Sequence, residues 1–135
     1  MLTKDDMLVA LHDAITEDQE FELADEIVDA MEASPQPFDL VAPILELIAN
    51  HPEVDFGSPG ELVHFVEKFY HQGYEDLLLE SVLKSPTVYN IWMLHRCYND
   101  NDPNLVRKIQ TLVGELKKEK TIDSQVRSMI EDLTW

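Results

Sequence analysis

The sequence comprises 135 residues, of which 10 are Lys or Arg and 27 are Asp or Glu, so the formal net charge is −17. Because 44% of the residues are hydrophobic, a chain of this length can bury a core, which argues against a disordered chain. The negative charge repels phosphate backbones and anionic lipid. It therefore disfavours direct binding of nucleic acid or a membrane surface and favours a basic partner.

The acidity is concentrated near the N-terminus. Residues 1–55 contain fifteen acids and one base, Lys4, for a charge of −14, whereas residues 56–135 contain twelve acids and nine bases, for −3. A concentrated block of charge produces a field that steers a cationic partner and that weakens with salt. The alternative is that the block only keeps the protein in solution.

The single cysteine and the N-terminus bear on the compartment. Cys97 alone forms neither an internal disulfide nor a multi-thiolate metal site, so nothing indicates an oxidising compartment. The N-terminal residues lack the basic start and apolar middle of a signal peptide, and no apolar stretch approaches the length of a membrane span. We therefore expect a cytoplasmic protein.

Capping residues and helical spacing predict three helices in the first half. Thr3 with Asp6 starts the first helix, Thr16 with Gln19 caps the second, and Asp39 caps the third. The apolar faces of these helices are Met7, Leu8, Leu11 and Ile15; Phe21, Ala24, Ile27, Val28 and Met31; and Val41, Ile44, Leu45 and Ile48.

Two helices are predicted in the middle of the chain. Ser58 supplies a capping hydroxyl, Pro59 occupies the first helical position and Glu61 the third, while Gly73 is placed to end that helix. The next helix, over residues 74–84, has apolar side chains around most of its wheel. Such a helix is expected to be enclosed by neighbours at the centre of the fold.

Three further helices complete the predicted all-α fold. Ser85 and Pro86 open one, whose apolar side includes His95, and Asp102 with Pro103 opens the next. The last is an amphipathic helix near the C-terminus, and no segment alternates long enough to predict a strand. About eight helices with short connections indicate antiparallel pairs in a single domain over residues 1–135. The pairs form either HEAT-like stacked helical hairpins, which we prefer, or an irregular bundle.

Few residue patterns point to catalysis. His64, Glu67 and His71 fall on one helical face, opposite the apolar face, so a metal-dependent enzyme is one hypothesis and a polar outer face is the simpler one. His95 is expected to be a core histidine with a local hydrogen-bond partner, and Cys97 a packed thiol. With four glycines the chain has no glycine-rich phosphate cradle. We predict a non-enzymatic protein without a cofactor.

An anionic stripe is the most suggestive functional pattern. On the predicted second helix the acids recur at steps of four, three, four and three, and no base is interleaved. Like charges four residues apart weaken an isolated helix by a few tenths of a kcal/mol per pair. The stripe is either a solvated face or a counter-surface for a basic groove, such as the substrate channel of a nuclease. Its residues are Asp18, Glu22, Asp25, Asp29 and Glu32.

A series of motifs runs from position 57 to position 96: Gly57-Ser58-Pro59-Gly60; Leu62-Val63-His64-Phe65 with Glu67; Gly73-Tyr74-Glu75; Leu77-Leu78-Leu79-Glu80-Ser81; Pro86-Thr87; and Trp92-Met93-Leu94-His95-Arg96. The series resembles a family of small helical immunity proteins from bacterial polymorphic-toxin and contact-dependent growth-inhibition systems. The resemblance covers about residues 56–99. Its motif residues are mostly caps and core positions, which inform the fold more than the target.

The resemblance implies an antidote that binds a cognate toxin domain in the cytoplasm and blocks its active site or substrate channel. Toxins of this kind are often nucleases, including metal-independent ribonucleases, and a nuclease needs a cationic groove that suits the acidic N-terminal half. We expect the partner to contact the stripe together with Asp55, Phe56, Tyr70 and His71. The alternative is a helical scaffold or adaptor that binds a basic protein or peptide without neutralising it.

Overall fold

The computed structural model describes residues 2–100 and 102–135. Within these ranges there are eight α-helices and one 3-10 helix but no β-strand, which confirms the predicted all-α class. The helices gather into two compact units, unit 1 (Met1–Tyr74) and unit 2 (Glu75–Trp135), where the sequence predicts one domain.

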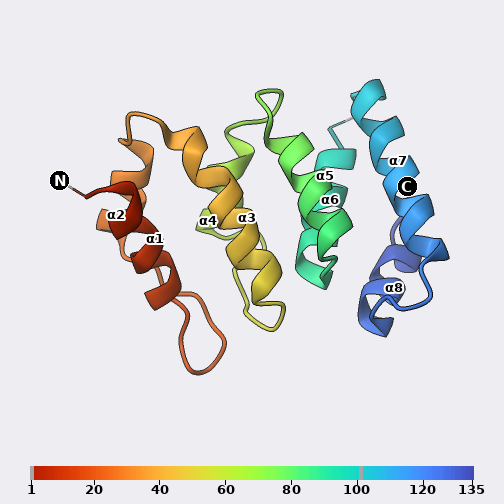
Figure 1. Cartoon of the computed structure of the whole chain (residues 1–135), viewed down its shortest axis with the longest axis horizontal. Coiled ribbons are helices and arrows are strands. Elements are labelled where there is room, and N and C mark those ends of the chain that lie inside the picture. The colour runs from red at the N-terminus through yellow and green to blue at the C-terminus, as the bar shows by residue number, and fades with distance from the viewer. Residues whose placement is uncertain (1, 101) are drawn as a thin grey trace. The chain divides into compact units, whose positions relative to one another are not determined.

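Unit 1 is a small bundle of helices, and long loops join α1 to α2 and α3 to α4 (Figure 1). Helices α1 and α2 contact each other, and the 3-10 helix η1 contacts both α2 and α3. The elements are α1 (Lys4–Asp13), α2 (Asp25–Glu32), η1 (Pro37–Leu40), α3 (Val41–Asn50) and α4 (Glu61–Glu67).

Helix α1 begins as its sequence predicts. The Thr3 hydroxyl accepts a hydrogen bond from the Asp6 amide at 3.1 Å, and the Asp6 carboxylate accepts one from the Thr3 amide at 2.9 Å. These two bonds form a capping box that satisfies otherwise unpaired amides at the helix start. The hydrogen bonds from Thr3 hold the pKa of Asp6 below its usual value.

The prediction of the second helix is wrong for its first half, because α2 begins at Asp25. Residues 14–23 instead form a loop. The Thr16 amide donates to the Glu20 carbonyl at 2.8 Å, and the Thr16 hydroxyl accepts from the Glu20 amide. These bonds close a turn in which Gln19 has a φ of 62°. The side chain of Thr16 is therefore used in a turn rather than in a helix cap.

Two other predicted helix starts also differ from the structure. No side-chain hydrogen bond caps α3, because η1 leads into it directly, so Asp39 is not its cap. Helix α4 starts at Glu61 with Gly60 as the N-cap, and its first turn includes neither Ser58 nor Pro59, which are joined by a cis peptide bond. Most of the predicted apolar faces of these helices are nevertheless buried, namely Val41, Ile44, Leu45, Ile48, Leu62, Phe65 and Val66. Phe69, which the sequence also places on the face of the second helix, is only half-buried and lies beyond the end of α4.

Unit 2 is built on contacts among its last three helices. Helix α6 packs against α7 and α8, and α7 also contacts α8. Both α7 and α8 begin at aspartate caps: Asp102 accepts hydrogen bonds from the amides of Asn104 and Leu105, and Asp123 from those of the first turn of α8. The cap at Asp102 confirms the predicted start. The elements are α5 (Tyr74–Lys84), α6 (Val88–Tyr98), α7 (Pro103–Lys118) and α8 (Ser124–Asp132).

Helix α5 has the predicted bounds but not the predicted enclosure. Leu78 and Val82 are fully buried, whereas Leu83 is 62% exposed and Leu79 is half-buried. One side of α5 is therefore buried, and an apolar edge of it reaches the surface.

The buried side of α6 also differs from the one predicted. The helix begins at Val88, after a capping box between Thr87 and Asn90, rather than at Ser85. The side that carries His95 is only half-buried, and the most deeply buried residues of the helix are Asn90, Ile91, Met93, Leu94 and Cys97.

His95 is half-buried rather than in the core, and its hydrogen-bond partner is distant in the sequence. Its Nε2 hydrogen-bonds the Thr134 carbonyl at 2.9 Å, and its ring lies 4.9 Å from that of Trp135. Buried Cys97 is confirmed as a packed thiol. No helix among the described residues has the length and apolar character needed to cross a membrane.

Candidate protein-binding cleft

A cleft of about 440 Å³ opens on the surface of unit 1. It lies between the loop of residues 14–23, the loop that follows α3, and the start of α4. We call this feature the acidic cleft, since four of its nine lining residues are carboxylates. Its lining comprises Glu20, Phe21, Glu22, Leu23, Asp55, Phe56, Gly57, Gly60 and Glu61.

Backbone hydrogen bonds hold the two loops of the acidic cleft together. The Asp55 amide donates to the Gln19 carbonyl at 2.9 Å, next to a parallel bridge between Glu20 and Asp55. The Glu22 amide donates to the Ala14 carbonyl at the end of α1, also at 2.9 Å. These bonds tie the carboxylate-bearing segments to the bundle, so the lining is fixed before any partner binds.

Aromatic packing forms the inner wall of the cleft. The rings of Phe21 and Phe56 lie 5.2 Å apart between centroids and are inclined at 51°. Phe56 is only 3% exposed. The expectation that Phe56 contacts a partner is therefore corrected: its ring is packed beneath the surface against Phe21 and supports the cleft.

The turn from Asp55 to Gly60 depends on two glycines. The Asp55 carboxylate accepts a hydrogen bond from the Gly57 amide at 2.9 Å, and Gly57 has a φ of 97°, which favours glycine. At Gly60, an added Cβ would lie 1.7 Å from the Phe56 carbonyl oxygen. The backbone therefore folds back on itself more closely than any side chain at position 60 would permit.

The carboxylates of the acidic cleft are exposed and largely uncompensated. Glu20, Glu22, Asp55 and Glu61 are all exposed, and no ion pair within residues 2–100 and 102–135 involves them. The described residues contain no group of three or more His, Cys, Asp or Glu side chains that could hold a metal ion. Exposed carboxylates on two loops and a helix start can accept hydrogen bonds from the several N–H donors of a lysine or arginine side chain.

The structure disperses the predicted anionic stripe. Asp18 lies in the loop before α2, and Glu22 lines the acidic cleft. Asp25 and Asp29 are exposed on α2, where Asp25 in the first turn also favours the helix dipole. Glu32 pairs with Lys68 at 2.6 Å. The prediction of a single helical stripe is thus wrong, because the segment that carries Asp18 and Glu22 is not helical.

Tyr70 and His71 lie apart from the acidic cleft, beyond the opposite end of α4 from Gly60. The Tyr70 hydroxyl donates to the Glu67 carboxylate at 2.9 Å, and His71 is exposed with a φ of 64°. Because α4 ends at Glu67, His71 does not share a helical face with His64 and Glu67. The three side chains therefore do not form the predicted row.

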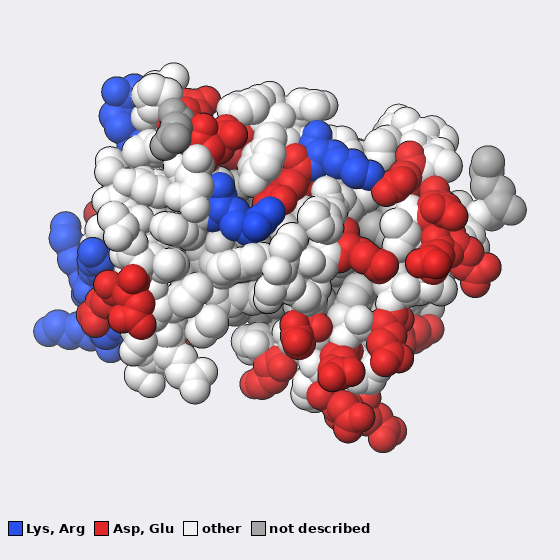
Figure 2. Space-filling model, turned by 180° about the vertical axis from the view of Figure 1, so that it is seen from behind, with Lys and Arg blue, Asp and Glu red and all other residues white. Residues whose placement is uncertain are grey.

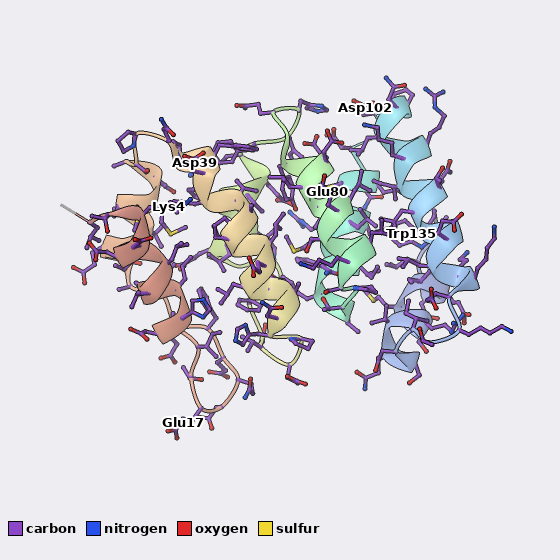
Figure 3. All side chains as sticks on the ribbon, in the orientation of Figure 1. Lys4, Glu17, Asp39, Glu80, Asp102 and Trp135 are labelled. Carbon is purple, nitrogen blue, oxygen red and sulfur yellow. The ribbon has the colours of Figure 1, made fainter. Side chains whose placement is uncertain are left out.

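The charge difference between the units is large. Unit 1 contains seventeen acids and two lysines, for a charge of −15, whereas unit 2 contains ten acids and eight bases, for −2. All fifteen acids among the first 55 residues are exposed. On the face drawn in Figure 2 acidic side chains crowd unit 1, while bases and acids are mixed on unit 2. Glu17 projects from the tip of the 14–23 loop (Figure 3).

The acidic cleft contains residues that the sequence pattern did not reveal. Glu20 and Glu61 are not on the predicted stripe, and the sequence pattern predicts Phe21 on the buried side of a helix. The only sequence signal for Glu20 was the density of acids in this segment. No family model, curated protein or solved structure matches this chain.

Proposed function

We propose that this protein is a non-catalytic binding protein that neutralises a basic partner, in the manner of an immunity protein bound to its toxin. The observation that carries the proposal is the acidic cleft, a preformed hollow with four exposed carboxylates within a unit of charge −15. Such a surface attracts a cationic protein over a longer range than any single contact and raises the rate of association.

The lining of the cleft favours a basic side chain as the bound group. A backbone bridge joins Glu20 and Asp55, so the backbone of the two loops loses little conformational entropy when a cation binds between them. Phe21 and Leu23 supply an apolar surface for the aliphatic stem of a lysine or arginine. A nucleic acid would meet strong repulsion at the same place.

The resemblance to immunity proteins supplies the class of partner. A toxin nuclease binds phosphates in a cationic groove, and unit 1 offers carboxylates that compete for the same groove. Occupation of that groove would block substrate entry without any chemistry by the inhibitor. A ribonuclease domain encoded next to this chain is the partner that we favour.

Growth rescue with matched charge variants tests the proposal. The product of the neighbouring toxin reading frame is expressed with the wild-type protein, with the cleft variant Glu20→Gln/Glu22→Gln/Glu61→Gln, or with the control Glu26→Gln/Asp39→Asn/Glu46→Gln. Both variants remove three exposed carboxylates of unit 1. We expect growth to be rescued by the wild type and the control but not by the cleft variant.

Three results would count against the proposal. Equal rescue by both variants would show that only total charge matters and would remove the cleft as the site. Failure of the wild type to bind the neighbouring product would remove the immunity function. Binding that leaves the partner's activity intact would favour the adaptor alternative.

A further inference from the structure

Unit 2 contains an apolar groove that the proposed function does not use. It lies between α5 and α7, encloses about 400 Å³ and is separate in residues from the acidic cleft. Leu79 and Leu83 come from α5 and Leu112 from α7. We call it the α5–α7 groove; its lining is Leu79, Glu80, Leu83, Lys108, Thr111, Leu112 and Glu115.

The apolar surface of this groove is unusual for the protein. Leu83 is 62% exposed, the highest value among the large hydrophobic residues exposed in the described ranges. A single exposed leucine needs no explanation. Here, however, exposed Leu83, half-buried Leu79 and Leu112, which is 8% exposed, line the same hollow. Such an apolar hollow can accept an apolar side chain of a partner.

The edge of the groove selects the charge of its occupant. Glu80 lies on α5 (Figure 3) and Glu115 on α7, and neither carboxylate forms an ion pair within the described residues. Lys108 is paired with Asp76 at 3.3 Å. Two uncompensated carboxylates therefore flank the leucines, which complements an apolar side chain with a lysine or arginine beside it. A second copy of this chain, with its charge of −17, is the less favourable occupant.

We infer that the α5–α7 groove is a docking site for a basic amphipathic segment of a partner protein. A leucine-like side chain of that segment inserts between Leu79, Leu83 and Leu112, while its basic side chains reach Glu80 and Glu115. The inference rests on residues of unit 2 alone. It therefore stands or falls separately from the proposed role of the acidic cleft in unit 1.

A synthetic amphipathic helix with leucines on one face and lysines on the other serves as the probe. Its binding to the full chain is measured by fluorescence anisotropy, and its position by the shifts of leucine methyl resonances. We expect the methyl groups of Leu79, Leu83 and Leu112 to shift. Leu83→Ser should weaken binding by about tenfold, since the variant loses a leucine contact that becomes buried when the helix binds.

The controls separate this groove from general attraction to an acidic protein. Val88→Ser changes another exposed apolar residue of unit 2, outside the groove, and should leave the affinity unchanged. A peptide with serines in place of the leucines keeps its charge and should bind much more weakly. Glu80→Gln/Glu115→Gln should weaken binding of the leucine–lysine helix and reduce its salt dependence.

Four results would overturn the inference. The first is that the protein binds the serine–lysine peptide as tightly as the leucine–lysine helix. The second is that Leu83→Ser leaves the affinity for the leucine–lysine helix unchanged, and the third is that the methyl shifts are confined to unit 1. The fourth is a wild-type dimer in sedimentation velocity that Leu83→Ser abolishes, because it would assign the groove to a second copy. Since Leu83 is mostly exposed, its replacement should leave the core of unit 2 intact, and thermal unfolding of each variant checks this.

Discussion

Phe21 and Phe56 pack with ring centroids 5.2 Å apart, and this pair joins the two loops that form the acidic cleft. Each ring belongs to a segment without regular secondary structure, so side-chain packing must supply part of the order that a helix would otherwise give. The pair thus links the core of unit 1 to the position of Glu20 and Asp55, whose backbones are bridged beside it.

Replacement of Phe21 by alanine is expected to loosen the cleft without unfolding the bundle. The ring is half-buried, so its loss should lower the free energy of unfolding by about 1–2 kcal/mol. Partner affinity should fall by more than in the control Glu46→Gln, which removes an exposed carboxylate outside the cleft. Hydrogen exchange at the Asp55 amide, which bonds to Gln19, measures the loosening directly. Unchanged exchange there would contradict the structural role of the pair.

The glycines at positions 60 and 114 should respond to alanine in opposite directions. A Cβ at Gly60 would lie 1.7 Å from the Phe56 carbonyl oxygen, whereas a Cβ at Gly114 meets no atom within 4 Å. Gly60→Ala should therefore destabilise the protein by about 2–3 kcal/mol. Gly114→Ala, within α7, should stabilise it by about 0.5–1 kcal/mol because alanine is the better helix former. Chemical denaturation of the two variants checks both signs.

Asn90 is predicted to be essential to the start of α6. Its Oδ1 accepts a hydrogen bond from the Thr87 amide at 2.8 Å, and its Nδ2 donates to the Ser85 carbonyl at 2.9 Å. Because Asn90 is only 1% exposed, Asn90→Ala leaves these groups without their partner and should cost about 2–3 kcal/mol of stability. The exposed Asn99 provides the control: Asn99→Ala should change stability by less than about 0.5 kcal/mol. Equal effects of the two substitutions in thermal unfolding would contradict this assignment.

The sequence predicted the elements of this fold best where caps and apolar periodicity agreed. At Thr3 and Asp102 a polar cap precedes a regular apolar face, and both helices begin there. At Thr16 the same type of residue closes a turn instead, since its hydroxyl bonds to the Glu20 amide and Phe21 packs on Phe56. That outcome depends on a contact between distant segments, which local spacing does not contain.

The same reason explains which part of the candidate site was missed. Asp55 and Glu22 were predicted to meet a partner, and both line the acidic cleft. Glu20 and Glu61 join them only because a backbone bridge and a close turn at Gly60 bring three segments together. The exposure of Leu83 was likewise not predictable from its helix, because it depends on where α7 lies against α5.

The capping box of α1 predicts a local dependence on pH. Hydrogen bonds from the amide and hydroxyl of Thr3 lower the pKa of Asp6 in the folded protein. A carboxyl group with a depressed folded-state pKa stabilises the fold above its unfolded pKa, and this contribution is lost as the pH falls through the folded value. We therefore expect the start of α1 to fray in acid at a pH below the ordinary aspartate range. An NMR titration of the Asp6 carboxyl carbon, followed with the amide of Thr3, measures this transition. Thr3→Ala should return the Asp6 pKa toward its ordinary value, whereas Thr16→Ala, outside the box, should leave it where it is. A normal Asp6 pKa in the wild-type protein would show that the carboxylate does not hold the helix start in solution.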